Sequence, residues 1–281
     1  MDSLNICFSA DDNYARHLGT SITSILCNGD ADNNYNFHIL DGGITEENKQ
    51  KLLELKKIKG FNLEFYKINP DEFDGCPLNR FYISLAAFYR FKIPALLPEN
   101  IDRALYLDCD TVVMKDLKEM FFTDLGDNMA AVVEDEGSIH QSERMKFPAS
   151  HIYFNSGILL LNLKELRKFD FEKECFRYLE ENREIIRLQD QDILNGVFLG
   201  KCKYLHLRWN ANGRIYIENN LRNNYTDQEI SEATTDPGIL HYTDVHKPWV
   251  DACKHPLRKE YLKFLAMTPW AGTPSLKELP R

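Results

Sequence analysis

Apolar runs of strand length alternate with amphipathic segments along the first two thirds of the chain. Residues 5–8 form a short apolar run that stops at a polar stretch. Leu18, Ile22 and Ile25 then recur at helical spacing. A strand, a polar loop and a helix are therefore predicted in this order.

The same pattern predicts the elements that follow. Strands are predicted at residues 36–40, 63–68, 103–107, 129–133, 158–161 and 238–240. Helices are predicted at residues 45–55, 84–97, 171–186 and 189–198. The helix at 84–97 is broken by Pro94 and closed by Pro98, because proline lacks the N–H that a helix interior needs. Strands alternating with helices indicate an α/β fold with a mixed, mainly parallel sheet.

Length and composition are those of an ordinary globular protein. The 281 residues suit one large or two small domains, and 43% of them are hydrophobic and 27% charged. Thirty-four Lys and Arg against 43 Asp and Glu give a net charge of −9. Proteins that gain affinity for nucleic acids by neutralising phosphates need an excess of positive charge, so we expect no nucleic-acid partner.

Cysteine usage and the chain ends bear on the compartment. The seven cysteines are scattered and form no C-x-x-C pair, which is typical of reduced thiols in the cytoplasm. We expect no secretory signal at the N-terminus and no transmembrane helix. Residues 246–281 carry seven Lys and Arg against three Asp and Glu. Peripheral contact with an anionic membrane is one interpretation of this basic end, and a solvated helix and tail is the other.

Acidic residues follow predicted strands at the places where open α/β sheets bind ligands. Asp11 follows the first strand, although a turn or helix cap also explains an Asp there. Asp108 and Asp110 follow strand 103–107 with the spacing i and i+2, which points both to one side of an extended segment. Two adjacent carboxylates repel each other, and a shared divalent cation is the simplest resolution. Nearby Asp116 is predicted to be a solvated surface carboxylate.

A third acidic group opens the predicted helix at 189–198. Asp190 and Asp192 both lie in its first turn, where the helix dipole favours negative charge. The dipole accounts for one of these aspartates and need not account for both.

Five segments in this order resemble glycosyltransferase family 8, and within it the bacterial lipopolysaccharide galactosyltransferases. They are residues 10–14, 106–110, 154–163, 189–195 and 241–249. The resemblance covers about residues 4–250 and implies a GT-A (Rossmann-like) fold, a nucleotide-sugar donor, Mn²⁺ and transfer with retention of anomeric configuration. We therefore expect a GT-A domain at 1–250 and a mildly basic helix or tail at 251–281.

The resemblance also implies roles for individual residues. Asp108, Asp110 and His241 match the metal ligands, and carboxylate and imidazole groups suit Mn²⁺, with Mg²⁺ as a substitute. The expected donor contacts are Asp11 and Asn13 at uracil and ribose, Lys247 at the diphosphate, Arg90 at the diphosphate and the sugar, and Asp135, Asn155, Asp190 and Gln191 at the sugar. Cys109 is also expected to contact the donor. Gln191 matches the side chain beside the reacting anomeric carbon, and Asp190 is the residue most expected to contribute to catalysis. The implied donor is a UDP-hexose, with galactose favoured over glucose, and the implied acceptor is a saccharide, a lipid-linked glycan or a glycoprotein.

Two positions depart from the family pattern, and two other functions remain open. Asp244 stands in place of the usual glycine, and Tyr82 stands where the galactosyltransferases carry a histidine facing the acceptor. Gln191 is a poor nucleophile, so front-face departure and attack is the alternative to double displacement. The competing functions are a protein that binds or hydrolyses UDP-sugars and a scaffold without acceptor transfer.

Overall fold

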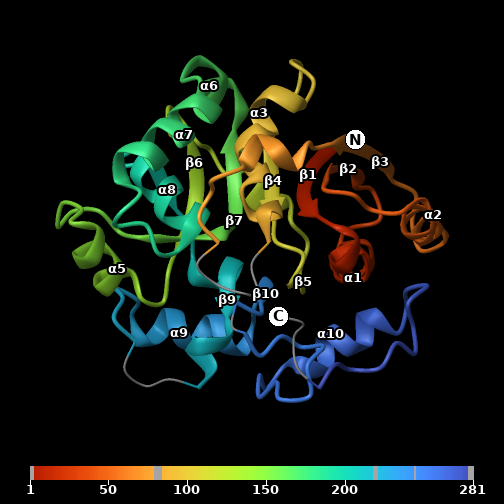
Figure 1. Ribbon diagram of the computed structural model, residues 1–281. Helices are drawn as coiled ribbons and strands as arrows, with labels where there is room; N and C mark the ends of the chain where they lie inside the picture. Colours follow the sequence, from red (N-terminus) through yellow and green to blue (C-terminus); the bar gives the residue numbers. More distant parts are fainter. Residues whose placement is uncertain (1–2, 79–83, 218–220, 244, 278–281) are drawn as a thin grey trace.

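A seven-stranded sheet with the strand order β3-β2-β1-β4-β7-β6-β8 forms the centre of the molecule in the computed structural model (Figure 1). The structure describes residues 3–78, 84–217, 221–243 and 245–277. The strands of this sheet are β1 (Ser3–Ala10), β2 (Asn34–Asp41), β3 (Asn62–Lys67), β4 (Arg103–Leu107), β6 (Ala130–Glu134), β7 (Phe154–Asn162) and β8 (Cys202–Tyr204). Only β7 runs antiparallel to its neighbours, β4 and β6. The predicted mixed, mainly parallel α/β sheet is confirmed.

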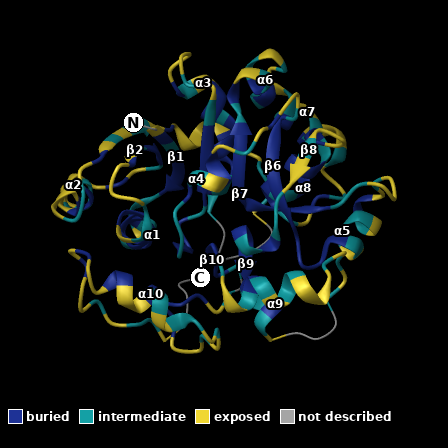
Figure 2. Cartoon of the chain, turned by 180° about the vertical axis from the view of Figure 1, so that it is seen from behind, coloured by how far each residue is buried: buried dark blue, intermediate teal, exposed yellow. Residues whose placement is uncertain are grey.

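Helices cover both faces of this sheet. They are α1 (Ala15–Asn28), α2 (Glu46–Glu54), α3 (Ile93–Leu96), α4 (Lys118–Phe121), α5 (Ser138–Met145), α6 (Leu163–Lys168), α7 (Phe171–Asn182), α8 (Gln189–Val197), α9 (Asp227–Thr235) and α10 (Arg258–Leu265). Successive side chains of a strand point to opposite faces, so Ile6 of β1 joins one apolar cluster with α1, α2 and α10, while Cys7 joins another with α3, α6, α7 and α8. The inner strands β1, β2, β4, β6 and β7 are buried almost throughout, whereas the edge strands β3 and β8 are partly exposed (Figure 2).

A small second sheet lies beside the carboxyl ends of β1 and β4. Its strands are β5 (Thr111–Val113), β10 (Ile239–His241) and β9 (Ala211–Asn212), in the order β5-β10-β9. β5 follows β4 after three residues. β10 pairs antiparallel with β5, so that His241 lies opposite Thr111. This register places the last residue of β10 beside the segment 108–110.

Two local predictions are wrong. Residues 84–97 form two 3-10 turns, Leu85–Ala87 and Tyr89–Lys92, and then the short helix α3, because Pro94 has no N–H to continue one α-helical ladder through this segment. Asp108 and Asp110 do not lie in an extended strand. They occupy a turn between β4 and β5, which is closed by a hydrogen bond from the Thr111 N–H to the Asp108 carbonyl (3.2 Å).

The C-terminal residues pack onto the same core as the N-terminal ones. Tyr261 and Phe264 of α10 are buried against the cluster that contains α1. The ring of Trp249 stacks on His17 of α1 with a centroid distance of 3.5 Å. Among the residues that the structure describes, no helix has both the length and the hydropathy that crossing a bilayer requires.

Candidate active site

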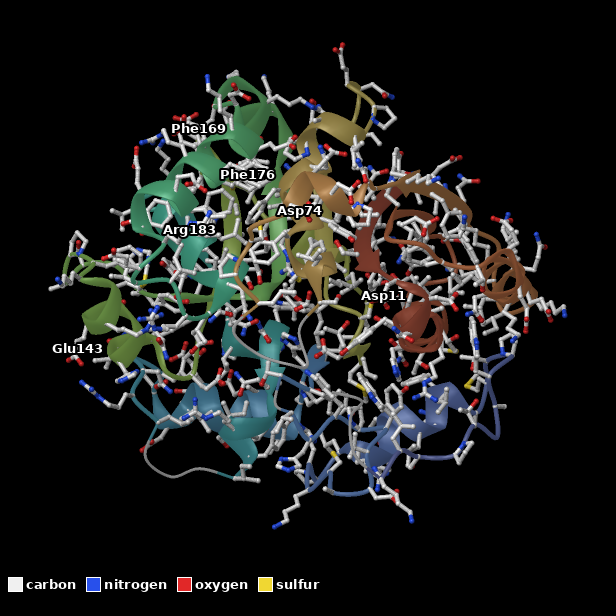
Figure 3. The ribbon with its side chains drawn as sticks, viewed as in Figure 1. Asp11, Asp74, Glu143, Phe169, Phe176 and Arg183 are labelled. Atoms are coloured by element: carbon white, nitrogen blue, oxygen red, sulfur yellow. The ribbon has the colours of Figure 1, made fainter. Side chains whose placement is uncertain are left out.

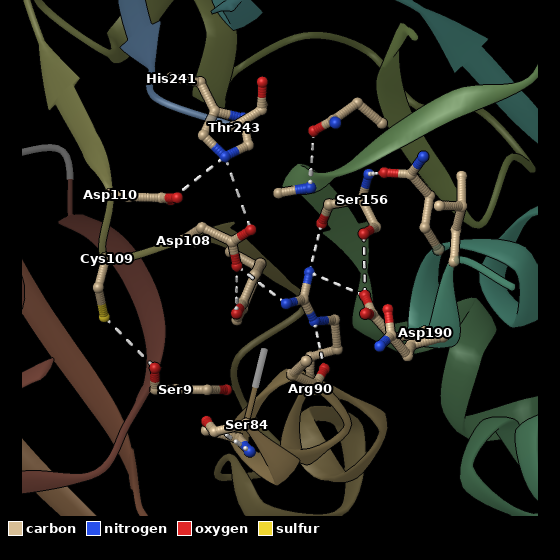
Figure 4. A pocket seen from close by; sticks show the side chains of 18 of the residues that line it. Ser9, Ser84, Arg90, Asp108, Cys109, Asp110, Ser156, Asp190, His241 and Thr243 are labelled. Atoms are coloured by element: carbon tan, nitrogen blue, oxygen red, sulfur yellow. Dashed lines mark hydrogen bonds and ion pairs between the residues drawn. The ribbon is translucent and has the colours of Figure 1, made fainter. Parts of the chain in front are cut away.

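A pocket of about 290 Å³ opens at the carboxyl ends of β1 and β4, between the two sheets (Figure 4). Side chains from both sheets and from α8 meet in it. The predicted site residues that line it are Asp11, Arg90, Asp108, Cys109, Asp110, Asp135, Asn155, Asp190, Gln191, His241 and Lys247. Asp11, labelled in Figure 3, caps the 3-10 turn Asp12–Tyr14 that directly precedes α1. Asn13 is exposed and is not part of the lining, and Tyr82 and Asp244 lie outside the described residues.

Asp108, Asp110 and His241 form a compact cluster within this pocket. One potential ligand atom from each of the three lies within 4.8 Å of those from the other two. The His241 Nε2 atom is 3.3 Å from Asp110 Oδ1 and 3.7 Å from Asp108 Oδ2. The turn between β4 and β5 brings the two carboxylates together, and β10 delivers the imidazole.

The two oxygens of Asp110 have different surroundings. Oδ2 accepts a hydrogen bond from Lys247 Nζ at 2.5 Å, whereas Oδ1 is buried without a hydrogen-bond partner and faces the imidazole. Burial opposes ionisation of Asp110, but the ammonium group of Lys247 and the neighbouring imidazole of His241 outweigh burial and lower its pKa well below the usual value. A buried carboxylate oxygen without a donor is costly, and a divalent cation between the three side chains would satisfy it. The cluster therefore fits a metal ion.

Asn210 orients the imidazole of His241, and the sequence analysis missed it. Its Oδ1 atom lies 2.9 Å from His241 Nδ1, while its Nδ2 donates to Asn155 Oδ1 at 3.0 Å. An amide oxygen accepts, so Nδ1 carries the proton and Nε2 turns its lone pair toward the two aspartates. This is the tautomer that a metal-binding histidine needs. No pattern in the surrounding sequence marks Asn210 for this role.

Gly157 allows the cluster to lie directly against β7. A Cβ atom at this position would lie 2.2 Å from His241 Cε1 and 2.6 Å from Asp108 Oδ2. The Asp108 N–H also donates to the Gly157 carbonyl at 2.8 Å. The missing side chain therefore makes room for two members of the cluster.

Arg90 connects the cluster of Asp108, Asp110 and His241 to Asp190. Its Nη2 donates to Asp108 Oδ1 at 2.9 Å, its Nη1 donates to the Ser156 carbonyl at 2.5 Å, and Nη1 is 3.3 Å from Asp190 Oδ2. The guanidinium is buried and lies 4.2 Å from the centre of the Tyr106 ring. One cation thus lies between two carboxylates and reduces the repulsion between them.

Asp190 has an unusual electrostatic environment. Its Oδ2 accepts a hydrogen bond from Ser156 Oγ at 2.8 Å. Burial raises the pKa of Asp190 to about 6, and Asp108 acts in the same direction against the opposing effect of Arg90. Perturbed carboxylates in a pocket are common at catalytic sites.

Gln191 and Asp135 meet in the pocket beside Ser156. Gln191 Oε1 accepts from the Ser156 N–H at 3.1 Å, and its Nε2 donates to Asp135 Oδ2 at 3.3 Å. Asp135 also accepts from the Gly137 N–H at 2.8 Å and from Asn155 Nδ2 at 3.4 Å. Burial raises the pKa of Asp135. These contacts hold the Gln191 amide in one orientation.

Two further predicted residues have defined surroundings. Cys109 donates its S–H to the Ser9 carbonyl at 3.3 Å, and burial raises the pKa of this thiol well above the usual value. Asp116 is not a solvated carboxylate, since it accepts hydrogen bonds from the Asp30 N–H at 2.7 Å and from Asn33 Nδ2 at 2.6 Å. The prediction for Asp116 is wrong because its acceptors satisfy donors at the end of α1 and the loop that follows.

The fold and the site together define the class of protein. A mainly parallel sheet with a pocket at its carboxyl edge, and a carboxylate and imidazole cluster at the end of the fourth strand, are the features of a GT-A glycosyltransferase. A crystal structure of the galactosyltransferase LgtC in complex with donor and acceptor sugar analogues superposes with a TM-score of 0.83 and 31% identity over 99% of this chain and 98% of that one. A structure of an active-site mutant of LgtC gives a TM-score of 0.84, also at 31% identity, over 95% and 96% of the two chains.

The family model described as "Glycosyl transferase family 8" matches residues 5–253, and the chain belongs to this family of enzymes. General stress protein A of Bacillus subtilis is 32% identical over 98% of both chains. A lipopolysaccharide 1,2-glucosyltransferase of Escherichia coli is 28% identical over 96% of this chain and 79% of its own. The resemblance seen in the sequence is thereby confirmed.

Proposed function

We propose that this enzyme transfers a hexose from a UDP-sugar to a saccharide or glycoconjugate acceptor, with retention of anomeric configuration and with Mn²⁺ or Mg²⁺ as cofactor. The observation that carries the proposal is the convergence of Asp108, Asp110 and His241 in the pocket that also holds Arg90 and Asp190. Galactose is the favoured donor sugar and glucose the alternative. The galactosyltransferase and the glucosyltransferase to which the chain is similar support both sugars.

The donor nucleotide would lie along the edge of the sheet formed by β1 and β4. Asp11 and Asn13 are proposed to contact uracil and ribose, and Cys109 would contact the donor through its backbone, since its thiol is buried and bonded to Ser9. Asp108, Asp110 and His241 would hold the cation, which when bound neutralises charge on the diphosphate leaving group. Lys247 would add positive charge to the diphosphate end while holding Asp110 in place.

The sugar would lie between Arg90 and the first turn of α8. Asp190, Asn155 and Asp135 offer acceptors for sugar hydroxyls, and Arg90 offers donors. Retention by double displacement requires a carboxylate nucleophile, but Gln191 carries an amide, and Asp190 is held by Ser156 and Arg90. We therefore propose front-face departure and attack, in which a diphosphate oxygen takes the acceptor proton, Gln191 lies beside the reacting carbon and Asp190 orients the sugar.

A donor and acceptor screen tests the proposal. With Mn²⁺ present, nucleotide release and product mass are followed for UDP-galactose and UDP-glucose, and proton NMR of the first product gives its anomeric configuration. An α-linked product from the α-configured donor is expected. A β-linked product, or tighter calorimetric binding of GDP or CDP than of UDP, contradicts the proposal.

The same assay separates the two alternatives. A hydrolysing protein would release UDP at a rate that no acceptor increases. A binding protein would bind UDP, and no acceptor would start turnover. A scaffold would bind neither metal nor UDP. The buried Asp110 oxygen beside His241 favours a working metal site over the scaffold, and the response to acceptor decides between transfer and hydrolysis.

Location is a separate proposal. We propose a cytoplasmic enzyme that contacts the membrane peripherally through Lys and Arg residues near α10. Sedimentation with vesicles containing anionic lipid, compared with neutral vesicles, tests this contact. Equal binding to both, or no binding, contradicts it.

A further inference from the structure

Asp192 is a carboxylate of α8 that does not line the pocket. It is fully buried and follows Asp190 by two residues and Gln191 by one. Successive residues of a helix are turned by about 100°, so Asp192 faces away from the side that Asp190 presents to the pocket. The proposed transfer reaction gives it no role.

Each oxygen of Asp192 has two donors. Oδ2 accepts from the N–H groups of Arg187 at 2.7 Å and of Leu188 at 2.9 Å. Oδ1 accepts from Arg144 Nη2 at 2.5 Å and from Tyr153 Oη at 2.6 Å. One oxygen therefore fixes the loop that enters α8, and the other ties α8 to α5 and to the residue preceding β7.

The backbone is strained at Gln189, which lies between this loop and the pocket residues Asp190 and Gln191. Gln189 has φ of 46°, in the left-handed region that side chains other than glycine rarely adopt, and it is fully buried. Such a conformation persists only where its surroundings determine it. The two N–H groups held by Asp192 come from the two residues directly before Gln189 and fix the chain there.

Arg144 also contacts a side chain of α5 that lines the pocket. Its Nε donates to Gln141 Oε1 at 2.7 Å, and its Nη1 donates to the Ile185 carbonyl at 2.9 Å. Gln141 lines the pocket. A single guanidinium thus fixes the buried face of α8, the loop before it and a pocket side chain on α5.

We propose that Asp192 and Arg144 are a positioning pair that holds Asp190 and Gln191 in their working orientation from behind the pocket. The proposal rests on the proposed function only for its kinetic consequence. The pair itself is defined by contacts that exist without substrate.

The variant Asp192→Asn tests the pair with little change of volume. Its amide oxygen can still accept from the loop N–H groups, but its NH₂ group then faces the Arg144 and Tyr153 donors. We expect kcat for UDP-hexose consumption to fall 10- to 100-fold, because small displacements of reacting groups carry penalties of this size. We expect the Kd for UDP with Mn²⁺ to stay within twofold of wild type. Arg144→Gln should act in the same direction, and the double variant should lose no more than the worse single variant, because coupled residues are not additive.

A readout that needs no turnover separates failure of this proposal from failure of the proposed function. Amide hydrogen exchange reports on the Ser156 N–H, which donates to Gln191 Oε1. In Asp192→Asn its exchange should accelerate at least tenfold, well below the melting temperature. If wild type consumes no UDP-hexose, the proposed function fails while this result still decides the positioning claim.

The matched control is Glu143→Gln. Glu143 projects outward from α5 beside Arg144 and pairs with Arg222 at the surface (Figure 3). Loss of the Glu143 carboxylate should leave the exchange rate of the Ser156 N–H and kcat unchanged. If Asp192→Asn only lowers the Tm, with kcat within twofold and unchanged Ser156 exchange, the pair is merely structural and the proposal is overturned.

Discussion

Asp110 is the cluster residue whose substitution distinguishes a metal site from an ordinary ion pair. Asp110→Asn keeps the shape but removes the charge that Lys247 and a cation would share. We expect Mn²⁺ affinity in the presence of UDP, measured by calorimetry, to fall at least tenfold and transfer to fall at least 100-fold, with an unchanged circular dichroism spectrum. His241→Ala should have the same effects, less severely, because imidazole adds a ligand without adding charge.

Asp127→Asn is the matched control for this variant, since Asp127 is exposed and does not line the pocket. It should bind Mn²⁺ and transfer sugar as wild type does. Full transfer in excess chelator, or equal behaviour of the two variants, would show that the cluster does not hold a required metal.

Asp190 links pH dependence to stability. Its folded pKa of about 6 lies above the ordinary 3.8, so the ionised form destabilises the fold. This penalty is absent below pH 4 and complete once the pH has risen well above 6. Asp190→Asn should therefore raise the Tm at pH 8, and the gain should disappear between pH 6 and pH 4 in melting curves.

Activity should move in the opposite direction. If the carboxylate form of Asp190 orients the sugar, kcat/KM in wild type rises with pH through an inflection near 6, and Asp190→Asn loses roughly 100-fold at neutral pH. A cation at Asp108 removes part of the repulsion, so saturating metal should shift the inflection downward. An inflection that is unchanged in Asp190→Asn would assign it to another group.

At the scale of elements, β7 packs directly against the cluster of Asp108, Asp110 and His241, because Gly157 has no side chain. Gly157→Ala would place a methyl group 2.2 Å from His241 and 2.6 Å from Asp108, so one or both must move. We expect Mn²⁺ affinity to fall at least tenfold while the helical circular dichroism signal is retained. Gly60→Ala is the control, because a Cβ at Gly60 meets nothing within 4 Å. Wild-type metal binding by Gly157→Ala would mean that the cluster is not formed as described.

At the scale of the whole molecule, the C-terminal segment completes the core over α1. Phe264→Ala removes a ring that is 1% exposed, and such truncations cost about 3–5 kcal/mol. We expect a Tm lowered by several degrees with no change in the UDP affinity of the folded protein. Lys259→Gln, at an exposed position of the same helix, should leave the Tm unchanged. If both variants melt alike, α10 is not part of the cooperative core.

The sequence alone determined the alternation of strands and helices, the acidic residues after β1 and β4, and the family, because these are local patterns of period and spacing. It did not determine the turn at 108–110 or the short turns around Arg90. The turn at 108–110 also depends on a distant strand, since the Asp108 N–H donates to the Gly157 carbonyl of β7. Pro94 predicts a break in the helix but not the 3-10 turns before it, where the Arg90 guanidinium bonds to Asp108 and to the Ser156 carbonyl.

Only the tertiary structure decided how distant residues meet. His241 reaches Asp110, 131 positions earlier, because β10 pairs antiparallel with β5 in one register, and a shift of one residue would turn its side chain to the other face. Asn210 and Arg144 have no distinguishing local signal, and the sequence marks Asp192 only as one of two aspartates that open a helix. Each acquires its role from a hydrogen-bond partner on another element, and the packing of the whole chain creates those contacts.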